Sequence, residues 1–169
     1  TMLSMPTSLT KAVVVPKTVT SIVASALKPL QEIVFEEGRT ASLSLASKFF
    51  QKNANLKKLE LNGPITLGTY AFDQCSALET LKINGQVTLG NYSFQKCTKL
   101  KTVTISGVKT FGTNMFNSCT ALETATIDFA GVLGNNAFQK CTSLKTVTLT
   151  RVTSTGTSAF DGCTNLETV

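Results

Sequence analysis

Apolar and polar positions along this chain follow an order that is clearest between residues 72 and 90. Apolar side chains come first at Phe72, Cys75 and Leu78, and this spacing favours a helical or 3₁₀ turn. Polar and apolar positions then alternate through residues 79–83, which predicts a half-buried β-strand. A turn signal and a glycine follow, so we expect the chain to reverse direction before the next apolar triplet.

The same unit recurs every 22 residues without slippage. Three columns mark it: Phe50, Phe72, Phe94, Phe116, Phe138 and Phe160; Cys75, Cys97, Cys119, Cys141 and Cys163; and Leu56, Leu78, Leu100, Leu122, Leu144 and Leu166. A period of roughly 20–50 residues is typical of a solenoid, in which each turn, or rung, buries its apolar side chains against neighbouring rungs. The sequence therefore predicts an α/β repeat solenoid of about seven rungs, with parallel strands on one face and short helical or 3₁₀ turns on the other.

Residues 1–169 are predicted to form a single solenoid domain with two parts. Regular 22-residue repeats occupy residues 50–169, whereas residues 1–49 carry irregular rungs. In that first part the apolar runs at 13–15 and 30–35 predict two strands, and residues 1–10 form an irregular start. Irregular rungs at one end are typical of a cap that shields the stack.

The repeat is interrupted at Val169, one strand residue into a new rung. We therefore expect that the chain is cut from a longer array, or that its open end pairs with a second copy of itself.

Charge and composition exclude several classes of function. The 16 Lys and Arg residues exceed the 10 Asp and Glu residues by a net charge of +6, but the lysines are scattered and only two residues are arginine. Nucleic-acid binding is not expected from such a distribution. The chain contains no histidine and no phosphate-binding loop, so neither an enzyme nor a cofactor is expected. It also lacks the roughly 18 consecutive apolar residues of a membrane span, so membrane insertion is not expected.

The five cysteines invite a disulfide or metal hypothesis, which their spacing does not favour. Each lies between a Phe and a Leu of the same unit, and Cys-x-x-Cys never occurs. Stacked rungs would present the thiols along one line, whereas zinc requires a tetrahedron. We predict buried free thiols, and Asn53 in the same column fits a role in hydrogen bonding to the turn backbone.

The outward side of the predicted strands is the candidate binding face. It carries threonines at alternating positions with lysines and glutamates beside them, so that three successive rungs read Thr-x-Thr. Threonine suits exposed strands, and a purely structural role remains open beside a binding role. The candidate residues are Thr80, Lys82, Lys101, Thr102, Thr104, Glu123, Thr124, Thr126, Lys145, Thr146 and Thr148.

A column of alternating charge runs beside the threonines. It comprises Lys57, Glu79, Lys101, Glu123, Lys145 and Glu167, so the full unit is a 44-residue double rung. Neighbouring opposite charges at about 4.8 Å attract, and we interpret the column as a surface ladder more than as a ligand site. Exposed ion pairs contribute at most about 1 kcal/mol each.

The repeated stretches AFDQCSALETLKI (71–83), SFQKCTKLKTVTI (93–105), AFQKCTSLKTVTL (137–149) and AFDGCTNLETV (159–169) resemble the BspA-like (Treponema-type) leucine-rich repeat family. The segment VVVPKTVTSI (13–22) is similar to an early motif of that family. The resemblance implies a leucine-rich repeat with its sheet on the concave face. It also implies a cell-surface or secreted protein that adheres to other molecules, and it transfers no binding residues.

We therefore expect a non-enzymatic binding module that presents its strand face to a protein, such as a host extracellular or cell-surface protein, or to a glycan. The alternative is a passive structural spacer within a longer array. A remote alternative is an ice-binding surface formed by the Thr-x-Thr lattice.

Overall fold

The structure is a computed structural model that describes residues 2–3 and 8–169. The predicted irregular start at residues 1–10 lies partly outside these residues, at positions 1 and 4–7.

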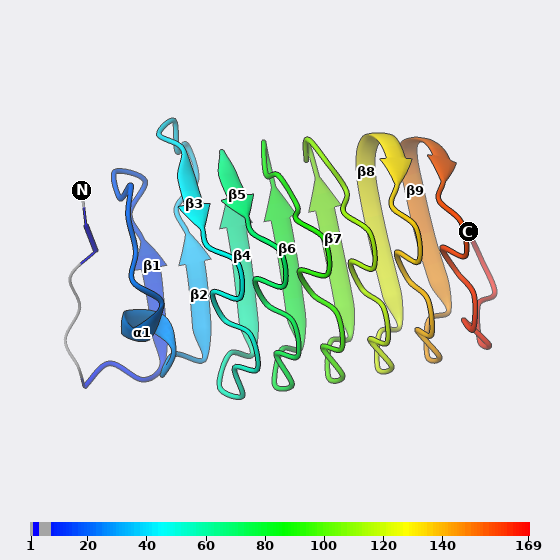
Figure 1. Cartoon of the computed structure of the whole chain (residues 1–169), viewed down its shortest axis with the longest axis horizontal. Coiled ribbons are helices and arrows are strands. Elements are labelled where there is room, and N and C mark those ends of the chain that lie inside the picture. Colours follow the sequence, from blue (N-terminus) through cyan, green and yellow to red (C-terminus); the bar gives the residue numbers. More distant parts are fainter. Residues whose placement is uncertain (1, 4–7) are drawn as a thin grey trace.

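A seven-stranded parallel sheet runs the length of the molecule, one strand to each rung (Figure 1). Its strands, in spatial and chain order, are β1 (Ala12–Val15), β2 (Glu32–Phe35), β4 (Lys58–Asn62), β6 (Thr80–Asn84), β7 (Thr102–Ser106), β8 (Thr124–Leu133) and β9 (Thr146–Thr155). From β4 onward, the strand residues at the start of each rung pair with those 22 positions later. The predicted parallel solenoid of about seven rungs is confirmed.

Alternation along the strands separates a core side from a solvent side. In β6, Leu81 and Ile83 are buried, whereas Thr80 and Lys82 are exposed. The same pattern holds in β7 and through the first residues of β8, so one face of the sheet lies against the core and the other faces solvent.

A second, short parallel sheet lies on the far side of the core, and the sequence analysis did not predict it. It pairs β3 (Leu43–Leu45) with β5 (Ile65–Leu67), and isolated bridges at Thr88 and Thr110 continue the ladder. In β8 and β9 the chain stays extended through a register shift, so these ten-residue strands contribute to both sides of the rung.

The predicted helical or 3₁₀ turns are not confirmed. The only helix in the described part of the chain is α1 (Ala24–Leu27), and the connecting segments are successive turns. The residues two positions before and two positions after each column phenylalanine have positive φ, for example Tyr70 (60°) and Gln74 (57°) around Phe72. A left-handed residue interrupts a right-handed helix and turns its N–H outward. The N–H of Gln74 thus donates to the carbonyl oxygen of Gln95 in the next rung (2.8 Å), so that the turns stack through hydrogen bonds as the strands do.

The core consists of the predicted columns. The column phenylalanines from Phe50 to Phe138 are at most 1% exposed, and consecutive rings stack with centroids 5.3–5.7 Å apart.

In the irregular first part, buried Arg39 donates to the carbonyl oxygens of Val19 and Pro16 (2.7 Å for Pro16) and so ties the first rung to the second. Burial lowers the pKa of this guanidinium, and Glu36 opposes that shift.

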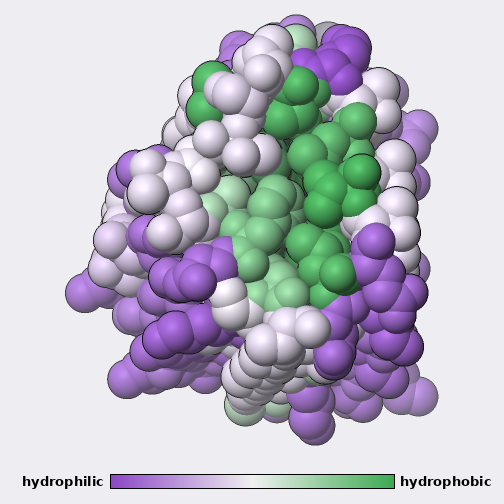
Figure 2. Space-filling view, turned by 90° about the vertical axis from the view of Figure 1, so that its right-hand side faces the viewer, coloured by the Kyte–Doolittle hydropathy of each residue, from purple (hydrophilic) through white to green (hydrophobic). Residues whose placement is uncertain are grey.

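The last rung leaves apolar groups in solvent. Phe160 and Leu166 are only partly buried, whereas Phe138 and Leu144 of the preceding rung are fully buried. Figure 2 looks onto this end of the stack and shows a continuous apolar area framed by polar residues.

Candidate binding surfaces

The threonines of the candidate face form two columns across the sheet. Thr80, Thr102, Thr124 and Thr146 pair in register, and two positions further Lys82, Thr104, Thr126 and Thr148 do the same. All are exposed except Thr146, which is half-buried. The other predicted residues, Lys101, Glu123 and Lys145, are exposed just before these strands. The structure therefore places all eleven candidate residues on or beside one face, with neighbouring rungs about 4.8 Å apart.

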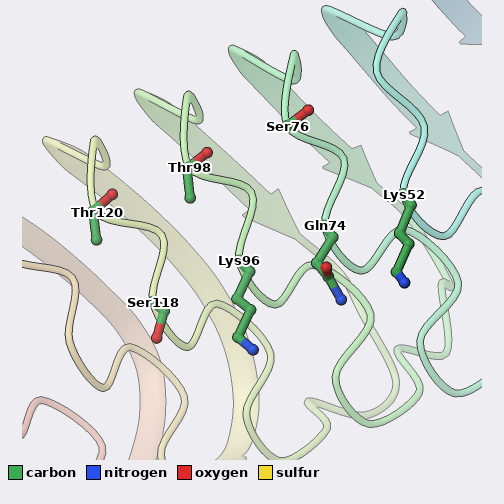
Figure 3. Close-up of a pocket in the computed structure, with 7 residues that line it drawn as sticks. All are labelled: Lys52, Gln74, Ser76, Lys96, Thr98, Ser118 and Thr120. Carbon is green, nitrogen blue, oxygen red and sulfur yellow. The ribbon is translucent and has the colours of Figure 1, made fainter.

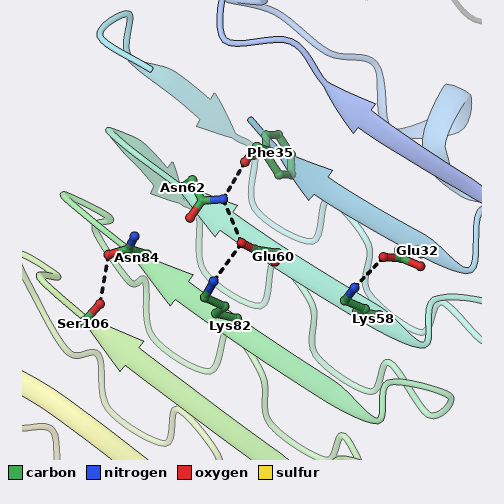
Figure 4. Close-up of polar contacts among 8 residues, drawn as sticks. All are labelled: Glu32, Phe35, Lys58, Glu60, Asn62, Lys82, Asn84 and Ser106. Atoms are coloured by element: carbon green, nitrogen blue, oxygen red, sulfur yellow. Dashed lines mark hydrogen bonds and ion pairs between the residues drawn. The ribbon is translucent and has the colours of Figure 1, made fainter. Parts of the chain in front are cut away.

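Two ion pairs lie at the other half of the sheet, over β2, β4 and β6 (Figure 4). Lys58 and Glu32 form an ion pair in which Lys58 Nζ donates a hydrogen bond to Glu32 Oε1 (2.6 Å). This hydrogen bond raises the pKa of Lys58. Glu60 accepts from Lys82 and Asn62 (3.2 Å each). Burial favours the neutral form of Glu60, but these two hydrogen bonds outweigh it, so the pKa of the carboxyl is lowered.

The predicted ladder of alternating charge forms as a column but not as ion pairs. The N–H groups of Lys101 and Glu123 donate to the carbonyl oxygens of Glu79 and Lys101 (2.9 Å each), so the residues are stacked. Among the described residues, however, none of their side chains forms an ion pair within 4 Å. In water such pairing gains too little to hold two long side chains in one geometry. The pairs that do form lie on the strands themselves, and the third joins Arg151 to Asp128 (2.6 Å).

The cysteine column is structural. All five thiols are free, four of them are buried, and each donates to the carbonyl oxygen of the preceding rung's phenylalanine at 3.1–3.4 Å. Asn53 takes the same place in its rung: its Nδ2 donates to the Lys28 carbonyl (3.0 Å), and its Oδ1 accepts from the N–H of Leu56 (2.9 Å). Burial raises the pKa of Cys97 and Cys141, which keeps these thiols protonated.

Within residues 2–3 and 8–169, no three His, Cys, Asp or Glu side chains gather closely enough to hold a metal ion. No helix in that same part of the chain is long and apolar enough to cross a membrane.

A second candidate surface, which the sequence analysis missed, is a groove across the connecting segments (Figure 3). Its volume is about 560 Å³, and it is lined by Lys52, Gln74, Ser76, Lys96, Thr98, Ser118 and Thr120. The signal was available, because Lys52, Lys96 and Lys140 recur at the 44-residue interval of the double rung.

Parallel strands, stacked turns and a continuous apolar core define this protein as a leucine-rich repeat solenoid. The crystal structure of a leucine-rich repeat protein of T. pallidum (TpLRR) is similar with a TM-score of 0.66 at 22% identity, over 92% of this chain and 77% of that one. A leucine-rich repeat protein from Eubacterium ventriosum ATCC 27560 gives a TM-score of 0.59 at 21% identity, over 90% of this chain and 58% of that one. At these identities the similarity shows the fold alone.

The family follows from the repeats themselves. The BspA type leucine rich repeat region, described as six copies, matches residues 5–123 and 84–169. The chain therefore belongs to the BspA-type leucine-rich repeat family, as the repeat motifs indicate. No curated protein matches the chain.

Proposed function

We propose that this protein is a non-enzymatic binding module of a cell-surface or secreted protein, and that its partner docks on the threonine columns of the sheet. The partner is an extracellular or cell-surface protein or a glycan. The sheet is presented on the concave side, as is usual in leucine-rich repeat solenoids.

The observation that carries this proposal is the division of the sheet into two halves. Over β2 to β6 the outward charges are paired with one another, as in Lys58–Glu32 and Lys82–Glu60. Over β7 to β9 the two outward columns are threonines in register. These hydroxyls can donate and accept hydrogen bonds, and their methyl groups can be buried by a partner without leaving a charge unpaired.

The experiment is a binding assay with fluorescent beads that carry the protein, on surfaces coated with fibronectin, laminin, collagen or mucin. The triple variant Thr102→Lys, Thr124→Lys, Thr146→Lys is expected to lose adhesion, since it places three charges in the middle of the face. The matched control is Thr18→Lys, Thr40→Lys, Thr164→Lys, which makes the same exchange at exposed positions outside both the sheet face and the groove. Equal adhesion of the two variants would contradict the proposal, and a wild-type protein that adheres to none of the surfaces would favour a spacer.

A further inference from the structure

We propose that the groove on the connecting segments binds a linear acidic glycan whose negative charge recurs on every second sugar. This site is separate from the sheet face, and the inference does not rest on the proposed function.

Two rows of side chains line the groove and run across the rungs (Figure 3). One row presents the hydroxyls of Ser76, Thr98 and Thr120. In the other row the ammonium groups of Lys52 and Lys96 project to the same side. A volume of about 560 Å³ is within the range of ligand-binding clefts, and the lining residues come from four successive rungs.

The cations of the second row occur on alternate rungs. Gln74 lies between Lys52 and Lys96, and beyond Ser118 the row continues to Lys140, one rung past the residues that line the groove. Rungs are about 4.8 Å apart, so neighbouring cations in this row are separated by roughly 10 Å. Within the described chain, none of these three lysines takes part in an ion pair, and all three are exposed.

The backbone fixes the direction in which each lysine side chain leaves the stack. Lys52, Lys96 and Lys140 have φ values of 61°, 56° and 60°. Their N–H groups donate to the next rung's carbonyl oxygens at 2.7–2.8 Å. Because each of these residues is tied into the stack, the spacing of the cations follows the spacing of the rungs.

The acidic residue stacked on the first lysine does not neutralise the row, although the N–H of Lys52 donates to its carbonyl oxygen (2.8 Å). Asp73 is 2% exposed, and its Oδ2 accepts from Gln51 (2.8 Å) and Gln74 (2.9 Å). Its charge is thus shielded from the groove by amide groups, and the ammonium groups remain available to a ligand.

The chemistry of the groove fits a sugar chain. A pyranose linked at its opposite ends advances by about the height of one rung, so a disaccharide with one acid group spans the interval between two lysines. The hydroxyl row supplies hydrogen bonds to sugar hydroxyls, and the lysine stems and threonine methyl groups supply apolar contact for the sugar ring. An extended acidic peptide advances by about 3.3–3.6 Å per residue, so only every third side chain reaches the height of a cation, and successive ones of these point to opposite faces of the peptide. The groove lining contains no aromatic residue on which a nucleic-acid base could stack.

The test measures fluorescence anisotropy of end-labelled oligomers at an ionic strength of about 0.15 M, where exposed charges more than about 8 Å apart are largely screened. The probes are a hyaluronan decasaccharide with a carboxylate on every second sugar, an oligogalacturonate of equal length with one on every sugar, and a glutamate decapeptide. The variant Lys52→Gln, Lys96→Gln, Lys140→Gln tests the groove. Glutamine is compatible with this backbone, since Gln74 adopts it at a φ of 57°.

The matched control is Lys11→Gln, Lys17→Gln, Lys109→Gln, which removes the same charge from exposed positions elsewhere. The groove variant is expected to bind hyaluronan at least about tenfold more weakly than the wild type, because three exposed cation–anion contacts are lost. The control variant and the Thr102, Thr124, Thr146 sheet variant are expected to stay within about twofold, since screened long-range charge contributes little. Absence of wild-type binding, equal loss in the control, or equal binding of the glutamate peptide would overturn the proposal.

A gain of charge tests the spacing directly. The double variant Gln74→Lys, Ser118→Lys places a cation on every rung of the row. Lysine is compatible with this backbone, since Lys52 and Lys96 adopt the same positive φ at the equivalent position of their own rungs. The ratio of affinities is then expected to shift toward the oligogalacturonate. An unchanged ratio would show that the alternate-rung spacing does not select the ligand.

Discussion

Replacement of Phe116 by alanine tests whether stacked neighbours on both sides stabilise each rung. Phe116 is fully buried, and its ring stacks on Phe94 at 5.7 Å and on Phe138 at 5.3 Å, with Phe111 tilted against it at 6.1 Å. Loss of a buried phenylalanine costs about 3–5 kcal/mol. Each aromatic pair contributes about 0.5–1.5 kcal/mol, so a ring with stacked partners on both sides belongs in the upper part of that range. We expect Phe116→Ala to lower the free energy of unfolding by about 4–5 kcal/mol.

The matched substitution is Phe160→Ala in the last rung. Phe160 is only partly buried and stacks on one ring, Phe138, at 5.5 Å, so we expect a cost of about 1–2 kcal/mol. Urea unfolding followed by circular dichroism measures both variants. With a slope of about 2 kcal/mol per molar urea, the two midpoints should differ by about 1.5 M. Equal shifts at unchanged slope would refute the reasoning, because they would show that burial from both sides is not what stabilises the column.

Three further outcomes are expected. Cys163, in the half-open last rung, should react with a maleimide in the folded protein at least about tenfold faster than the four inner thiols, as mass spectrometry of the labelled protein would show. Equal rates would contradict the burial of the column. Gly112→Ala should cost about 2–3 kcal/mol, because its methyl group would lie 2.6 Å from a backbone oxygen of the preceding rung. By comparison, Gly38→Ala has open space and should cost only about 1 kcal/mol for its φ of 70°, as thermal unfolding would measure. Glu60 has a lowered pKa, so its contribution to stability is present above the unfolded pKa and is lost as the pH falls through the folded pKa. In a carboxyl NMR titration, Lys82→Gln should move the Glu60 midpoint upward, and an unmoved midpoint would exclude the pair as a cause.

The strands and the core could be predicted because burial alternates with a simple period. Leu81 and Ile83 had to face inward once residues 79–83 were identified as a strand, and both are buried. The role of Asn53 also followed from its column, since a group there must satisfy the backbone of the turn. In each case a local pattern and its repetition were sufficient.

The backbone of the connecting segments could not be predicted. Tyr70, Lys96 and Ser118 adopt positive φ although none is a glycine, and a local propensity argument favours the right-handed turn. Hydrogen bonds to the next rung, such as Lys96 N–H to Asn117 carbonyl (2.8 Å), offset that local cost. The groove depends on this conformation: the 44-residue recurrence of its lysines was visible in the sequence, but the direction in which they leave the backbone was not.

The sequence by itself determined the period, the parallel order of the strands and the burial of the phenylalanine, cysteine and leucine columns, because a repeat that buries its apolar face against copies of itself has few other solutions. Only the tertiary structure decided that Glu32 pairs with Lys58 across the irregular step between β2 and β4. It also decided the position of the second sheet and the direction in which the lysines of alternate rungs project. These features depend on contacts between rungs, and such contacts exist only once the stack has formed.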